Sequence, residues 1–138
     1  MATTQKEMPK AKHVRKDDRP AVAIGHVRIA THSVVETIDF FRSLGLRHIF
    51  RNANFGVLEL RGGTHLIVSK REKPIRKGTE APFDIMVDNL KTTHKEYAKK
   101  GFEPSEIASG SVHSSFFIRA PSGHKLKITS SHAGSRAI

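Results

Sequence analysis

The sequence contains no cysteine, which excludes disulfides, thiolate metal sites and cysteine nucleophiles. It has no tryptophan and one tyrosine, so it lacks the aromatic-rich basic strands that are typical of RNA-recognition domains. No apolar run approaches the roughly 20 residues that span a bilayer, and residues 1–20 contain no apolar segment of a secretory signal. We therefore expect a cytoplasmic protein with no membrane partner.

Two common functional motifs are also missing. The sequence has neither the Gly-x-Ser-x-Gly elbow of serine hydrolases nor a phosphate-binding loop of the Gly-x-x-x-x-Gly-Lys-Ser/Thr type. Its 138 residues are enough for one ordinary domain.

The positive charge is concentrated in two polar segments. The net charge is +11, from 24 basic and 13 acidic residues. Residues 1–20 carry six of the basic residues and have no apolar periodicity, which predicts a disordered basic tail. A second basic cluster covers residues 70–77. Because both clusters have the composition of solvated segments, nucleic acid is not favoured as the main partner.

Apolar periodicity predicts an α+β domain over residues 21–132, made of two βαβββ modules. The first module covers about 22–69, a linker covers 70–81, the second module covers about 82–131, and residues 133–138 form a tail. The predicted strands are 23–31, 47–51, 55–61 and 64–69, then 82–87, 103–107, 114–120 and 125–130.

Each module contains one predicted helix, and the two helices mark an internal duplication. Ser33 and Glu36 have the spacing of a capping box at the start of the first helix, and Asn89 is placed to cap the second. Gly45 and Gly101, which are 56 positions apart, end the two helices. A single βαβββ module cannot cover both faces of its sheet, so we expect the two copies to pair.

Two segments resemble the glyoxalase/bleomycin-resistance family of the vicinal oxygen chelate superfamily. The opening segment is HVRIATHSVVETIDFFRSLGL (26–46), and the closing hairpin is FFIRAPSGHKLKI (116–128). The resemblance implies cupped mixed sheets around a cavity and a dimer. It also implies either a divalent-metal enzyme, such as a dioxygenase, or a metal-free drug-binding protein.

The family's four metal-ligand positions fall on His26, Ile67, Pro82 and Lys127 in this sequence. Isoleucine and proline side chains cannot bind a metal, and a lysine adds a positive charge where the cation would lie. We therefore expect no metal at the usual positions and no cofactor.

A displaced metal site is the alternative. Residues two apart on a strand share a face. His65 should therefore lie on the same face as Ile67, and Asp84 on the same face as Pro82. Together with His26 they would form a two-histidine, one-carboxylate set suited to Fe(II), Mn(II) or Ni(II).

Positive and aromatic side chains predict a pocket for an anionic or polar small molecule. By the same alternation, Arg28 shares a face with His26, and Lys125 shares one with Lys127. Phe117 is placed to form an aromatic wall, while Phe116 faces the helix. The predicted ligand pocket comprises His26, Arg28, His65, Asp84, Phe117, Lys125 and Lys127.

Three functions stay open at this point. The first is a metal-free, glyoxalase-like small-molecule-binding protein, acting as a homodimer. The second is a lyase, isomerase or dioxygenase that uses the displaced metal site; here Glu59 is either a general base or an ion-pair partner of Arg61. The third is an interaction module whose basic tail and linker bind nucleic acid or an acidic partner. The sequence does not determine whether the modules pair within one chain or across a dimer.

Overall fold

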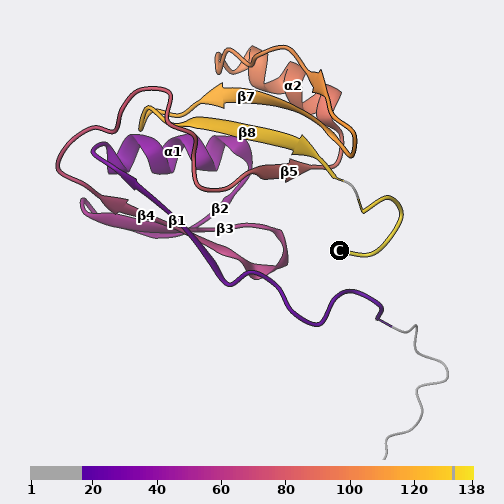
Figure 1. Ribbon diagram of the computed structural model, residues 1–138. Coiled ribbons are helices and arrows are strands. Elements are labelled where there is room, and N and C mark those ends of the chain that lie inside the picture. Colours follow the sequence, from indigo (N-terminus) through magenta and orange to yellow (C-terminus); the bar gives the residue numbers. More distant parts are fainter. Residues whose placement is uncertain (1–16, 132) are drawn as a thin grey trace, which may run out of the picture.

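The computed structural model describes residues 17–131 and 133–138 (Figure 1). It contains two four-stranded mixed sheets and two α-helices, which confirms the predicted α+β fold of two βαβββ modules. The predicted tail over residues 1–20 lies mostly outside the described residues.

The first module has the strand order β1-β4-β3-β2, with β1 and β4 parallel. Its elements are β1 (His26–Thr31), α1 (Val34–Leu44), β2 (Arg47–Arg51), β3 (Phe55–Glu59), the 3₁₀ turn η2 (Arg61–Gly63) and β4 (His65–Lys70). The second module repeats this arrangement in the order β5-β8-β7-β6, with β5 and β8 parallel. Its elements are β5 (Ile85–Val87), α2 (Leu90–Lys99), β6 (Ala108–Ser109), β7 (Ser114–Arg119) and β8 (Lys125–Ser130).

The two helices begin differently. Asn89 caps α2 as predicted, because its side-chain oxygen accepts a hydrogen bond from the Thr92 backbone N–H at 3.0 Å. Ser33 lies at the start of α1 but makes no side-chain capping bond, so the predicted capping box with Glu36 is wrong. The Ser33 hydroxyl instead lies 3.1 Å from the Thr31 hydroxyl.

The strands predicted at 23–31 and 82–87 begin later, at His26 and Ile85. Two further predicted strands differ from the structure for local reasons. The strand predicted at 103–107 is displaced to β6, because Glu103 has a positive φ of 53° and Pro104 has no N–H to donate to a ladder. The strand predicted at 55–61 ends at Glu59, because the chain turns into η2 at Arg61.

Helix α1 lies between the first sheet and the second module (Figure 1). The Phe40 and Phe102 rings meet edge to face at 5.2 Å between centroids. The Tyr97 hydroxyl of α2 donates a hydrogen bond to the Leu44 carbonyl at the end of α1, at 3.1 Å. One continuous apolar core therefore joins the two modules through their helices, and each sheet keeps one face that no helix of its own module covers.

Candidate functional site

The seven predicted pocket residues fall into two groups on different sheets. His26, Arg28 and His65 lie on the helix-free face of the first sheet. Phe117, Lys125 and Lys127 lie on the corresponding face of the second sheet, and Asp84 immediately precedes β5. Among the residues that the structure describes, no hydrogen bond, ion pair or ring contact joins the two groups.

A row of polar side chains crosses the whole first sheet. Strand register places Arg47 beside Glu59, Glu59 beside His65, and His65 beside His26. The Arg47 Nε atom lies 3.1 Å from Glu59 Oε1, and His65 Nε2 lies 3.2 Å from Glu59 Oε2. The His26 and His65 rings meet edge to face at 6.1 Å.

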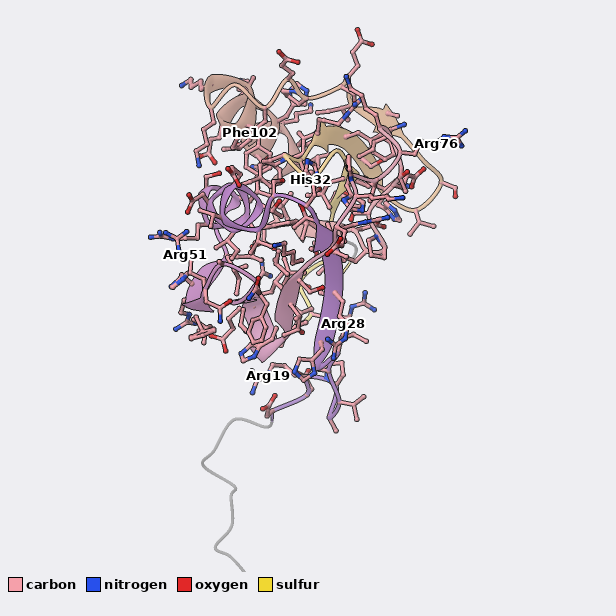
Figure 2. The ribbon with its side chains drawn as sticks, turned by 90° about the vertical axis from the view of Figure 1, so that its left-hand side faces the viewer. Arg19, Arg28, His32, Arg51, Arg76 and Phe102 are labelled. Carbon is pink, nitrogen blue, oxygen red and sulfur yellow. The ribbon has the colours of Figure 1, made fainter. Side chains whose placement is uncertain are left out.

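The contacts in this row are of the kind that general acid–base catalysis uses, with a histidine beside a carboxylate. When His65 donates its Nε2 hydrogen to Glu59, its Nδ1 atom is left as a proton acceptor. Arg47 forms an ion pair with the other oxygen of the same carboxylate. Both Glu59 and His65 are partly buried. Arg28, one step further along β1, is exposed at the surface (Figure 2).

The predicted pairing of Glu59 with Arg61 is wrong. Arg61 lies in η2, where the strand alternation has ended, and it contacts Asp88 at 3.2 Å instead. Sequence reasoning therefore missed Arg47 as the partner of Glu59. Only the register of β2 on β3 shows that Arg47 lies beside Glu59, since the two residues are on different strands.

On the second sheet, two lysine side chains lie over one aromatic ring. The Lys125 ammonium lies 4.2 Å from the Phe117 ring centroid, and the Lys127 ammonium lies 5.6 Å from it. Phe117 is half-buried, whereas Phe116 is buried on the opposite face against the His94 ring of α2. The predicted division of the two phenylalanines between faces is thus confirmed.

These two lysines take part in none of the ion pairs found within residues 17–131 and 133–138. Two cations without carboxylate partners that lie over one aromatic ring can together bind a negative group.

The residues at the family's metal positions do not fit a divalent cation. His26 is the one donor among them, because Ile67 and Pro82 have no side-chain donor and the Lys127 ammonium lies over Phe117. The displaced set is not brought together either. Across the described part of the chain, no three histidine, aspartate or glutamate side chains are close enough to hold a metal ion.

Asp84 instead lines a cavity of about 640 Å³ between the two modules. The wall is mainly apolar and includes Val27, Leu60, Phe83 and Val87. This cavity is separate from the lysine–phenylalanine group and is chemically different from it.

A second histidine environment lies in the turn between β7 and β8. His124 is buried, and its Nδ1 atom lies 2.7 Å from the Ser122 hydroxyl. Burial lowers the pKa of His124, and the nearby positive charge of Arg71 lowers it further. His124 is therefore a neutral structural residue of this turn near neutral pH.

Comparison with known proteins identifies the fold. The sequence matches no family model and no curated protein. The structure is similar to that of lactoylglutathione lyase from Agrobacterium tumefaciens, with a TM-score of 0.68 at 13% identity over 85% of this chain and 99% of that chain. It is also similar to a glyoxalase/bleomycin resistance protein/dioxygenase from Alicyclobacillus acidocaldarius, with a TM-score of 0.63 at 18% identity over 81% of this chain and 93% of that one.

A third similar structure is the bleomycin-binding protein from Streptomyces verticillus, in complex with copper(II)-bleomycin. The TM-score is 0.61 at 16% identity, over 82% of this chain and 99% of that chain. The chain therefore has the fold that these glyoxalase/bleomycin-resistance/dioxygenase proteins share. This confirms the sequence resemblance at the level of the fold, which hosts many activities.

Neither α-helix could cross a bilayer. Within residues 17–131 and 133–138 they contain 11 and 10 residues, whereas a span needs about 20.

Proposed function

We propose that this protein binds an anionic small molecule on the helix-free face of its second sheet, without the family's usual metal centre. The observation that carries the proposal is the placement of the Lys125 and Lys127 ammoniums over the Phe117 ring. A carboxylate or phosphonate would accept charge-assisted hydrogen bonds from the lysines, while an attached ring would stack on Phe117. The protein from Streptomyces verticillus shows that a chain of this fold can bind a small molecule.

The test is isothermal titration calorimetry with benzoate and phenylphosphonate, and with benzylamine as a cation of similar shape. We expect the two anions to bind and benzylamine to fail. The double variant Lys125→Gln/Lys127→Gln should weaken anion binding at least tenfold, since it removes two charge-assisted contacts of about 1.5 kcal/mol or more each. Lys91→Gln/Lys95→Gln, on exposed positions of α2, is the matched control and should bind normally.

Equal binding of benzylamine and benzoate would reject this proposal. So would equal anion affinity in the Lys125/Lys127 variant and the control, because the anion would then bind elsewhere. Phe117→Leu separates stacking from charge: it should weaken benzoate binding and leave binding of inorganic phosphate unchanged.

We also propose that the protein forms a homodimer. Phe50 and Phe55 lie on the helix-free face of the first sheet, where they are 46% and 40% exposed and their rings contact each other at 5.6 Å. An exposed aromatic pair of this kind is suited to burial against a second copy. Analytical ultracentrifugation should give a dimer mass, and Phe50→Glu should give a monomer. A monomer at every concentration tested would refute the dimer.

A second candidate function is proton transfer at His65, which the Glu59–His65 contact at 3.2 Å favours. Lactoylglutathione is a suitable first substrate, because a lyase for it shares this fold. If His65 is the base, any activity should be lost in His65→Gln and reduced in Glu59→Gln and Arg47→Gln. Activity that is absent in the unmodified protein, or unchanged in His65→Gln, would reject this candidate for that substrate.

A further inference from the structure

The linker between the modules is held against the second sheet by backbone hydrogen bonds. The Gly78 N–H donates to the Gly123 carbonyl at 3.1 Å, and the Lys125 N–H donates to the Thr79 carbonyl at 2.8 Å. A bridge between Glu80 and Lys125 continues this pairing. These bonds make the linker a fixed part of the surface beside the β7–β8 turn. A flexible linker would not form backbone hydrogen bonds with a strand.

The adjacent basic residues Arg76 and Lys77 lie in a tight turn of the linker. The Thr79 N–H and hydroxyl both donate to the Arg76 carbonyl, at 3.1 and 2.6 Å. Gly78 supplies the positive φ of 89° that this turn needs. The Ile75 side chain is half-buried and packs beside Gly123 of the β7–β8 turn. Arg76 consequently projects outward from the edge of the molecule (Figure 2).

Five cations lie along the linker and at the end of β7 next to it, and we call this surface the basic shelf. Its members come from the linker and from the end of β7: Arg71, Lys73, Arg76, Lys77 and Arg119. All five are exposed, and none belongs to an ion pair formed within the described residues. Glu72 and Glu80 are the acidic residues of the linker, so the shelf keeps a positive excess.

We propose that the basic shelf binds the phosphate backbone of duplex nucleic acid without reading its sequence. Arginine side chains match phosphate geometry, and a fixed array of unpaired cations gains by releasing the counterions of a densely charged duplex. Residues 70–81 contain no aromatic side chain on which an unpaired base could stack, which favours a duplex over a single strand. The basic shelf adjoins the proposed small-molecule site, because Lys125 pairs with both Glu80 and Arg119, but the two sites use different side chains.

The test measures binding of the full chain to a fluorescently labelled 20-base-pair DNA duplex, by anisotropy, over a series of salt concentrations. The shelf variant is Arg76→Glu/Lys77→Glu. The control is Lys91→Glu/Lys95→Glu on α2, which changes the net charge by the same amount. We expect the shelf variant to lose about tenfold or more in affinity near 150 mM salt. Its log–log salt slope should fall by about 2, because each phosphate contact contributes about 0.9.

The control should lose less than about threefold, since it alters only the long-range field. Equal losses in the two variants would overturn the proposal, because net charge alone would then explain binding. An unchanged salt slope in the shelf variant would also overturn it. If polyglutamate binds the unmodified protein but not the shelf variant, and the duplex binds neither, the nucleic-acid proposal is wrong and the partner is an acidic protein. Benzoate binding by the shelf variant should stay normal, which separates this test from that of the small-molecule site.

Discussion

Gly56 on β3 provides a direct test of how helix α1 packs on the first sheet. Gly56 is buried, and a Cβ atom added there would overlap the Ile38 side chain of α1 and lie 3.1 Å from the Phe50 carbonyl oxygen. Gly56→Ala should therefore destabilise the protein by about 1–3 kcal/mol, the usual cost of overpacking a tight core. In a chain of this size, that corresponds to a fall in Tm of about 3–10 °C.

The assay is urea unfolding followed by circular dichroism, with a double-mutant cycle. Ile38→Val removes the methyl group that the new Cβ would meet, at a cost of about 0.5–1.5 kcal/mol on its own. Because the overlap is relieved, Gly56→Ala/Ile38→Val should be more stable than the sum of the single effects by about 1 kcal/mol.

Gly25→Ala is the matched control, since no atom lies within 4 Å of a Cβ built at that position. It should change the free energy of unfolding by less than about 0.5 kcal/mol. Additive effects of Gly56→Ala and Ile38→Val, or equal costs for Gly56→Ala and Gly25→Ala, would refute this packing of α1.

Three further predictions concern stability. Asn89→Ala should cost about 1 kcal/mol because it removes a helix cap, and Ser33→Ala should cost less because that side chain caps nothing; equal costs in urea unfolding would contradict this. Tyr97→Phe should cost about 1 kcal/mol through loss of the hydrogen bond to Leu44, and an unchanged unfolding midpoint would argue against that contact. Because the pKa of His124 is lowered by folding, the unfolded chain binds this proton more tightly, so stability should fall as the pH drops below about 6.5. His124→Gln should flatten that dependence by up to about 1.4 kcal/mol per pH unit, and identical pH profiles of the two proteins would show that His124 does not contribute.

Most secondary-structure elements could be predicted because their signals are local. Turn residues bounded β2, apolar alternation placed β8 at its observed bounds, and glycines ended both helices. The same alternation put Lys125 and Lys127 on the face of Phe117, since residues two apart on a strand share a face. Local patterns failed at residues 103–107, where a left-handed residue followed by a proline prevents regular pairing.

The sequence by itself determined the two βαβββ modules, the glycine helix ends and the faces of β1, β7 and β8, because each depends on residues within about one turn or one strand. The tertiary structure decided which side chains from different strands meet. Strand register, which joins residues distant in the sequence, brought Glu59 to Arg47 and His65. The packing of the two modules through their helices separated Asp84 from the histidines of the first sheet. The composition of the linker predicted only a solvated segment. Backbone pairing with β8 holds this linker in place and makes it a fixed basic surface.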